Sequence, residues 1–280
     1  MTASYLKMLR PTQWLKNLML FFPPFLAGQM LVPGIIARGI VPFGAFCLVS
    51  SAGYIFNDLL DRDRDAQHPQ KRLRPIASGV VSLSGASLIS ALLLIAGLLL
   101  AVFISPRFLL LLACYAAIST SYSLWLKKLP IVDLFCISAG FLLRLQAGGG
   151  LFSVPISPWL FLTVFLLAVF LSTGKRLSES CSLGDMAGKH RISLAHYPPG
   201  FLHGTMFMTA AAVLVTYAMY ALNRQALIYS VPLCLFGLLR YMFRVSSGKG
   251  GDPTESLLKD RLLFIVGLLW VLMVVWSVYL

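Results

Sequence analysis

Four side chains with oxygen ligands lie on one face of a predicted helix that turns by about 100° per residue: Asn57, Asp58, Asp61 and Asp65. Asp63 projects from the opposite side. Three carboxylates on one face repel one another unless a cation lies among them, and Mg²⁺ prefers oxygen ligands of this kind. The run therefore predicts a Mg²⁺ site formed by Asn57, Asp61 and Asp65. Asp58, Asp61 and Asp65 are the predicted catalytic residues.

A group of cations follows the carboxylates along the chain, and its members are Lys71, Arg72 and Arg74. When Mg²⁺ bridges carboxylates to a substrate phosphate, Lys and Arg side chains neutralise the remaining phosphate oxygens. The sequence therefore predicts a diphosphate site whose substrate-binding residues are these three cations and Asn57. The alternative is a solvated, charged helix end, because cytoplasmic loops of membrane proteins are enriched in Lys and Arg without any substrate.

A third charged cluster follows the sixth long apolar run. Its predicted substrate-binding residues are Lys175, Arg176, Glu179 and Arg191. The cations of this cluster would bind a second anionic group, because Lys and Arg are common partners of phosphate oxygens. A second metal ion bound through Glu179 and Asp185 is an alternative that the sequence leaves open.

Five further residues are weaker substrate-binding candidates: Lys16, Asn17, Tyr122, Lys127 and Arg144. The first two belong to a tryptophan-containing run that is also typical of an anchor at the membrane interface. Tyr122 and Lys127 either line the same cavity as the aspartates or cap two helices. Arg144 lies near the middle of an apolar run, where a charge is costly and is expected to face the interior of a bundle.

The elements that position these residues are predicted to be membrane-spanning helices. Of the 280 residues, 58% are hydrophobic and 12% are charged, whereas soluble domains are about 45–50% apolar and about 25% charged. This composition excludes a soluble enzyme and predicts one membrane-embedded domain, residues 1–280. The predicted fold is an all-α bundle of nine transmembrane helices, because nine apolar runs are each long enough to cross a hydrocarbon core about 30 Å thick. They centre on residues 18–34, 38–56, 80–104, 107–126, 132–151, 157–174, 200–222, 226–245 and 260–280.

Two local patterns refine this description. Pro23 and Pro24 lie inside the first apolar run, which favours a kinked helix that is retained over a cleaved signal peptide. The run Asp252–Glu255 predicts the start of a helix, with an aspartate as the cap, proline at the first helical position and glutamate at the third.

The distribution of charge predicts how the spans are oriented. The chain carries 23 Lys and Arg against 10 Asp and Glu, a formal net charge of +13. Nineteen of the cations and all 10 acids fall in the N-terminal segment, in alternate connections or at their edges. The positive-inside rule therefore predicts a cytoplasmic N-terminus and an active site on the cytoplasmic face of a bacterial inner membrane. No polar domain is left to bind nucleic acid, and the five cysteines form no metal-binding motif.

The motif Asn57-Asp58-x-x-Asp61-x-x-x-Asp65 resembles the first aspartate-rich motif of the UbiA-type intramembrane prenyltransferase superfamily. Further runs are similar to its decaprenyl-phosphate phosphoribosyltransferase branch, and together they cover nearly the whole chain: Arg10-Pro-x-Gln13-Trp14-x-Lys16-Asn17, Asp65-x-x-His68-Pro69-x-Lys71-Arg72-x-Arg74, Leu126-Lys127, Pro130-Ile131-x-Asp133, Gly140-Phe141-x-x-Arg144, Gly174-Lys175-Arg176-x-x-Glu179 and Asp252-Pro253-Thr254-Glu255. The aromatic prenyltransferases of the superfamily carry a second aspartate-rich motif after the sixth span. This chain carries the Lys175–Glu179 cluster there.

The resemblance implies a nine-helix bundle with a cytoplasm-facing cavity for Mg²⁺ and a diphosphate. It also implies a Mg²⁺-dependent phosphoribosyltransferase whose partners are 5-phosphoribosyl 1-diphosphate and a polyprenyl phosphate in the membrane. The products would be polyprenyl-phosphoryl-5-phosphoribose and diphosphate.

Two other functions remain as alternatives at this point. The first is a UbiA-type enzyme that prenylates an aromatic or other small acceptor. The second is a transporter of an anionic metabolite or lipid, although nearly all charges lie outside the apolar runs. The sequence decides neither the length of the polyprenyl chain nor the oligomeric state, and a homo-oligomer is one of the possible assemblies.

Overall fold

The computed structural model of the chain describes residues 2–69, 71–183, 192–224 and 226–280. Every regular element in these ranges is a helix, as expected for an all-α fold, and the chain divides into two compact units. Unit 1 comprises Met1–Phe25, Gln29–Lys127 and Leu143–Val154, and unit 2 comprises Leu26–Gly28, Lys128–Leu142 and Pro155–Leu280. The helix α7 (Val132–Phe152) begins in unit 2 and ends in unit 1.

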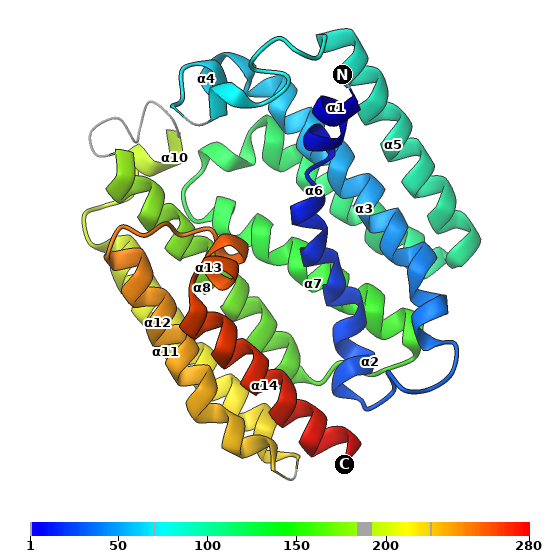
Figure 1. The fold of residues 1–280 in the computed structure, drawn as a ribbon, viewed down its shortest axis with the longest axis vertical. Helices are drawn as coiled ribbons and strands as arrows, with labels where there is room; N and C mark the ends of the chain where they lie inside the picture. The colour runs from blue at the N-terminus through cyan, green and yellow to red at the C-terminus, as the bar shows by residue number, and fades with distance from the viewer. Residues whose placement is uncertain (1, 70, 184–191, 225) are drawn as a thin grey trace. The chain divides into compact units, whose positions relative to one another are not determined.

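The helices of each unit can be followed by colour along the ribbon in Figure 1. Those that belong wholly or mainly to unit 1 are α1 (Thr2–Leu9), η1 (Pro11–Phe21), α2 (Phe22–Leu26), α3 (Ile35–Leu60), α4 (Arg62–Ala66), η2 (Lys71–Leu73), α5 (Leu83–Ile104), α6 (Pro106–Leu124) and η3 (Leu126–Lys128). Those of unit 2 are α8 (Pro158–Leu183), α10 (Ile192–Ala195), α11 (Phe201–Leu222), η5 (Leu227–Ser230), α12 (Val231–Ser246), α13 (Pro253–Lys259) and α14 (Arg261–Tyr279).

Eight helical segments in the described residues are long and apolar enough to cross a membrane. They coincide with the last eight of the nine predicted spans, with α12 extended at its start by η5. The first predicted span, 18–34, differs because it is not one continuous α-helix. The 3₁₀ helix η1 covers its start and the short helix α2 continues it to Leu26. Pro23 and Pro24 lie in the first turn of α2, where a missing N–H removes no intrahelical hydrogen bond.

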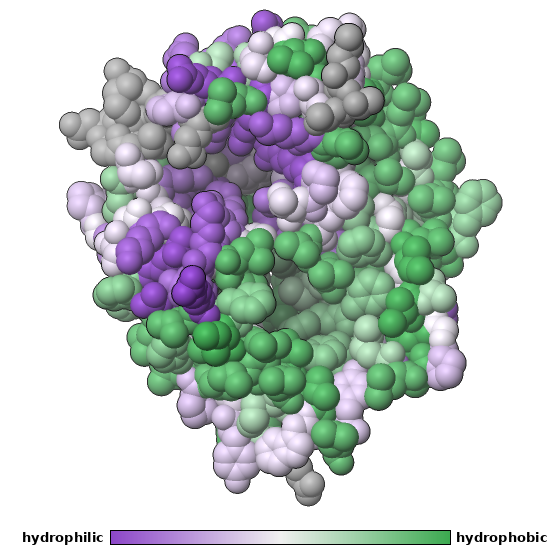
Figure 2. Space-filling model, viewed as in Figure 1, coloured by the Kyte–Doolittle hydropathy of each residue, from purple (hydrophilic) through white to green (hydrophobic). Residues whose placement is uncertain are grey.

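The outer surfaces of α5 and α14 are apolar, which is typical of helices in contact with lipid. Large hydrophobic side chains of α5 are exposed at spacings of three and four residues, which place them on one helical face: Leu88, Leu92, Ile95, Leu99 and Val102. In Figure 2 the edge of the molecule formed by α5 is green, the colour of hydrophobic residues. These faces and the eight spans identify a multi-pass membrane protein.

The core of unit 1 forms where α3 packs against α5, α6 and η1 (Figure 1). Small residues permit this close packing. A Cβ atom on Gly97 of α5 would lie 2.6 Å from a methyl group of Val49 and 3.0 Å from the carbonyl oxygen of Ala45, both in α3. Phe46 of α3 fills the centre and meets the ring of Phe108 edge to face. The close packing fixes α3, whose last turn carries the aspartate motif.

The core of unit 2 forms where α8 packs against α11 and α12, and α12 packs against α14. Phe170 of α8 and Tyr241 of α12 are buried with their ring centroids 5.4 Å apart. Gly174 makes room for the Tyr241 ring, because a Cβ atom at this position would lie 2.6 Å from a ring carbon. This contact fixes the end of α8 that carries the second charged cluster.

Candidate active site

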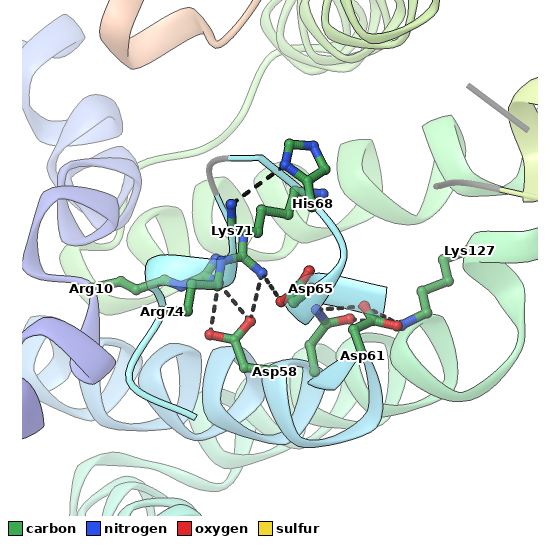
Figure 3. A network of polar contacts seen from close by, with 9 residues as sticks. Arg10, Asp58, Asp61, Asp65, His68, Lys71, Arg74 and Lys127 are labelled. Atoms are coloured by element: carbon green, nitrogen blue, oxygen red, sulfur yellow. Dashed lines mark hydrogen bonds and ion pairs between the residues drawn. The ribbon is translucent and has the colours of Figure 1, made fainter. Parts of the chain in front are cut away.

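The aspartate motif occupies the last turn of α3 and the short helix α4 (Figure 3). Helix α3 ends at Leu60 and Asp61 adopts φ −95° and ψ 6°, so that α4 starts in a new direction at Arg62. The predicted single helical face is therefore divided between two helices. Asp58 and Asp65 are both buried, while Asp63 is exposed, in agreement with the side predicted for each.

Asp58 is neutralised by two arginines that come from different parts of unit 1. Arg10 donates to both carboxylate oxygens of Asp58, at 2.6 and 2.8 Å, across 48 positions of sequence. Arg74 donates to the same carboxylate at 3.0 Å. Both Arg10 bonds come from Nη2, and hydrogen bonds between charged partners such as these are roughly twice as strong as neutral ones. Arg10 itself lies in the left-handed region with φ 53°, a strained conformation that the Asp58 contact helps to hold.

Asp65 shares Arg74 with Asp58, since the guanidinium donates to Asp65 at 2.5 Å. Burial raises the pKa of Asp65, and the nearby charges of Arg74 and Lys71 oppose this shift. Arg74 thus joins two carboxylates that the break between α3 and α4 would otherwise leave repelling each other. His68 accepts a 3.4 Å hydrogen bond from the backbone N–H of Lys71 and so holds the turn of the loop.

Asn57 and Asp61 form the second part of the cluster, around the ammonium group of Lys127. The Nζ atom of Lys127 lies 2.7 Å from Oδ2 of Asp61 and 3.0 Å from Oδ1 of Asn57. The Asn57 amide also donates to Oδ2 of Asp61, at 3.1 Å. Lys127, a weak candidate from the sequence, therefore contacts two of the three predicted metal ligands, while the third, Asp65, pairs with Arg74.

Positively charged side chains lie beside the aspartates, where the sequence predicts a metal ion. Because Arg10, Arg74 and Lys127 neutralise the aspartates, the fold of this region does not need Mg²⁺ to overcome their repulsion. Among the described residues, no group of three or more His, Cys, Asp or Glu side chains is arranged to hold a metal ion. The donors nevertheless suit Mg²⁺, because Asn57 and Asp61 already direct hard oxygen atoms at one cation.

A separate charged cluster lies in unit 2 around Asp133 of α7. Arg176 of α8 donates through Nε to Asp133 at 2.8 Å and through Nη1 to Glu179 at 2.8 Å. The side chains of Arg176 and Asp133 are 3% and 0% exposed. In the structure, Arg176 and Glu179 are thus engaged in a buried ion-pair network, and the substrate contacts predicted for them stay predictions.

Tyr197 completes the Asp133 cluster. Its hydroxyl donates to Asp133 at 2.8 Å and accepts from the backbone N–H of Ile131 at 2.7 Å. Burial raises the pKa of the Tyr197 hydroxyl well above its ordinary value, and the Asp133 charge contributes in the same direction. The hydroxyl therefore remains a donor at physiological pH. Ile131 has φ 67°, which is unfavourable for a β-branched residue, so Tyr197 holds a strained turn.

Arg144 points into the core of unit 1 rather than to its surface. It is buried, lies 4.3 Å from the centroid of the Tyr115 ring, and donates through Nε to Oδ1 of Asn17 at 2.7 Å. The amide of Asn17 in turn donates to Ser50 and to the sulfur of Cys47, both in α3. In the structure, Arg144 and Asn17 therefore hold η1 against α3 and α7.

The other predicted residues are placed as follows. Lys16, Lys71 and Tyr122 are partly buried, and Arg72 is exposed. Lys175 forms an ion pair with Asp252. Asp252 also caps α13 as predicted, by accepting from the N–H groups of Thr254 and Glu255. Arg191 and Asp185, and with Asp185 the alternative of a second metal, lie outside the described residues.

Comparison with known proteins identifies the family. The model of the UbiA prenyltransferase family matches residues 21–268. The chain belongs to the UbiA prenyltransferase family. The resemblance seen in the sequence motifs is thereby confirmed, and both charged clusters fall inside the UbiA match except for Arg10.

Two relatives and one solved structure place the chain within the UbiA family. It is 32% identical to decaprenyl-phosphate phosphoribosyltransferase of Mycolicibacterium smegmatis, over 97% of this chain and 91% of the relative. It is also 32% identical to the protein of the same name from Corynebacterium glutamicum, over 98% and 86%. A UbiA homolog from Archaeoglobus fulgidus, solved bound to GPP and Mg²⁺, has the same fold, with a TM-score of 0.75, 21% identity and coverage of 99% and 100%.

Arg10 and Tyr197 belong to the two charged clusters, and neither is among the site residues that the sequence predicts. Asp133 is part of a motif and, with Tyr122 and Lys127, could line the same cavity as the aspartates or cap a helix. Arg10 belongs to the motif before the first span, which marks it as a candidate but does not indicate its pairing with Asp58. Tyr197 gave no comparable signal, because its partner Asp133 is 64 positions away and no local spacing relates the two. These partners emerge only when the UbiA fold brings the helices together.

Proposed function

We propose that the protein transfers 5-phosphoribose from 5-phosphoribosyl 1-diphosphate to a polyprenyl phosphate in the membrane. The observation that carries this proposal is the similarity, over nearly the whole chain, to two decaprenyl-phosphate phosphoribosyltransferases. The chemistry of the aspartate cluster supports it. Three carboxylates there face Arg10, Arg74 and Lys127, with Lys71 close to Asp65, so a diphosphate meets a surplus of positive charge.

The reaction requires little chemistry beyond positioning and charge stabilisation. The C1–O bond of the phosphoribosyl donor breaks and diphosphate leaves with the electron pair, while an oxygen of the acceptor phosphate forms a new bond to C1. This oxygen is already anionic at neutral pH and needs little help from a base. Arg74 and Lys127 exchange carboxylate partners for oxygens of the diphosphate. Together with Lys71, they stabilise the negative charge that the diphosphate gains.

Mg²⁺ fits this reaction as the cofactor. Asn57, Asp61 and Asp65 would hold it, and when bound it would supply positive charge to the leaving diphosphate. Asp58 remains beside these ligands, and it ties the loop that carries Arg74 and the segment that carries Arg10 to the end of α3. Lys175 and Arg191 are proposed to bind substrate phosphate as well. The active site is proposed to face the cytoplasm from the inner membrane, with the N-terminus on the same side.

The function is tested with membranes that contain the protein. Phosphoribosyl diphosphate labelled in the ribose is supplied with polyprenyl phosphate, with and without EDTA. Label should move into the lipid fraction, and EDTA should abolish the transfer. No transfer of label, together with prenylation of an aromatic acid from a prenyl diphosphate, would replace this proposal with the aromatic prenyltransferase alternative. Uptake of the label into the lumen of sealed vesicles without lipid product would favour a transporter.

A further inference from the structure

Asp252 uses its two carboxylate oxygens for different partners. Oδ1 accepts from the backbone N–H groups of Thr254 at 3.1 Å and Glu255 at 3.2 Å, and so caps α13. Oδ2 accepts from Nζ of Lys175 at 3.0 Å, and this lysine lies 77 positions earlier in α8. The cap was evident from the sequence, whereas the contact with Lys175 was not.

Backbone packing brings Asp252 to Lys175. A Cβ atom on Gly251 would lie 2.7 Å from the carbonyl oxygen of Gly174 and 3.0 Å from Cα of Lys175, so only glycine lets the loop approach α8 this closely. The Tyr241 hydroxyl, which packs over Gly174, donates to the carbonyl oxygen of Gly251 at 2.7 Å. The pair is therefore built into the fold of unit 2 and does not arise from two mobile surface side chains.

The carboxylate is needed by Lys175 and not by the cap. Asparagine caps helices about as well as aspartate. The cap needs one side-chain oxygen, so an asparagine at position 252 would cap α13 equally well. The two side chains are 38% and 22% exposed, and an ion pair with this much exposure contributes little to stability. Its effect is to restrict a flexible lysine. One of the three N–H donors of the ammonium faces Asp252, and among the described residues no side chain other than Asp252 accepts from the other two, which can donate to another anion.

We propose that Asp252 is a positioning residue that holds the Lys175 ammonium for a phosphate group of a substrate. This inference rests on the proposed function, in which both substrates are phosphorylated. It gives the loop before α13, residues 247–252, a part in substrate binding through Lys175, although Asp252 itself touches no substrate. Loss of the carboxylate should weaken substrate binding and leave the chemical step unchanged, because Lys175 keeps its charge and loses only its fixed place.

The test uses Asp252→Asn, which retains the acceptor for the α13 cap and removes the acceptor for Lys175. The purified full-length protein is assayed for transfer of labelled phosphoribose, and KM is measured for each substrate. We expect KM for one phosphorylated substrate to rise about threefold to tenfold, the range for ordering one long side chain, with kcat within about twofold of wild type. Thermal unfolding should stay within a few degrees of wild type.

Two further variants separate positioning from a structural effect. In a Lys175→Met background, Asp252→Asn should cause no additional rise in KM, because the residue that it positions is gone. Asp260→Asn is the matched control. Asp260 likewise caps a helix, α14, and pairs with a cation, Arg240, which has no role in the proposed reaction. This control should leave both KM values unchanged.

The outcomes distinguish this inference from the function on which it rests. If the wild-type protein transfers no phosphoribose, the proposed function and the inference both fail. If the wild type is active and Asp252→Asn leaves both KM values unchanged, only the inference fails. It also fails if Asp252→Asn raises KM equally with and without Lys175.

Discussion

The two charged clusters differ in how deeply their ion pairs are buried. In unit 1, the cations Arg10, Arg74 and Lys127 keep 24%, 27% and 10% of their side chains exposed, although the Asp58 and Asp65 carboxylates that the two arginines bind are buried. In unit 2, Arg176 and Asp133 are almost completely enclosed. Partly exposed pairs exchange partners at low cost, whereas breaking a buried pair leaves an unpaired charge out of water. From the difference in the exposure of the cations, we expect the aspartate cluster to contribute to ligand binding and the Asp133 cluster to contribute to the stability of the fold.

The largest effect is expected from Arg176→Met. The substitution retains an apolar stem of similar length and leaves the Asp133 carboxylate without its guanidinium. Removing one partner of a buried pair should lower the free energy of unfolding by about 3–5 kcal/mol. The measurement is unfolding of the purified protein by SDS in mixed micelles.

The control for Arg176→Met is Lys259→Met, which breaks an exposed pair with Glu255 on α13. It should change the free energy of unfolding by at most about 1 kcal/mol. A loss for Arg176→Met as small as that for Lys259→Met would show that the Asp133 network is dispensable for stability, and the structural role expected for this cluster would fail.

The next effect is on activity and comes from Asp61→Asn in the aspartate cluster. The substitution retains the shape of the side chain but removes the negative charge that faces Lys127 and is proposed to hold Mg²⁺. Transfer should fall by about 10²–10³-fold, as for the loss of one electrostatic contact to a transition state, while the protein remains folded. The rate is measured at saturating Mg²⁺ and both substrates.

Asp63→Asn is the control for Asp61→Asn, because Asp63 is an exposed aspartate in the same segment. It should be nearly as active as wild type. Near-wild-type activity of Asp61→Asn at saturating Mg²⁺ would contradict the proposed metal site. A loss of activity accompanied by unfolding would mean that Asp61, like Asp133, mainly stabilises the fold.

Much of the fold could be predicted because the last eight spans each have a long apolar run. The first span could not, since an apolar run does not distinguish a 3₁₀ helix from an α-helix. Eleven residues of 3₁₀ helix are unusual, and side-chain contacts with α3 hold them: Trp14 donates to Ser51, and Asn17 donates to Ser50. Contacts of this kind depend on tertiary packing, which leaves no periodic signal in the sequence.

In the candidate site, too, local spacing predicts some features, whereas others depend on tertiary packing. The spacing of Asp58, Asp61 and Asp65 predicted a common cluster because a helix relates nearby residues. The partners of these aspartates were not predicted, since Arg10 and Lys127 are 48 and 66 positions away from Asp58 and Asp61. Protein cations offset the repulsion between the carboxylates, so this repulsion alone does not require a metal ion, and the Mg²⁺ site stays a prediction. Local spacing identifies chemical groups, whereas the fold decides which of them neutralise one another.

The smallest effect is expected from Tyr197→Phe, which tests whether the Asp133 cluster is purely structural. The variant removes one hydroxyl donor from the buried carboxylate and leaves Arg176 in place. A hydrogen bond to a charged group contributes about 1.5–3 kcal/mol, so the free energy of unfolding should fall by that amount while kcat and KM of the folded protein change less than about twofold. Tyr229→Phe, at an exposed tyrosine, should alter neither.

The pH dependence of the free energy of unfolding provides a second test of the role of Tyr197. Because the pKa of Tyr197 is raised in the folded protein, its hydroxyl stabilises the fold fully below the ordinary tyrosine pKa of about 10. Above that pH the unfolded chain ionises first, and the stability difference between wild type and Tyr197→Phe should shrink. A difference that grew with pH, or a rise in KM without loss of stability, would mean that Tyr197 contacts substrate and that the second cluster also takes part in binding.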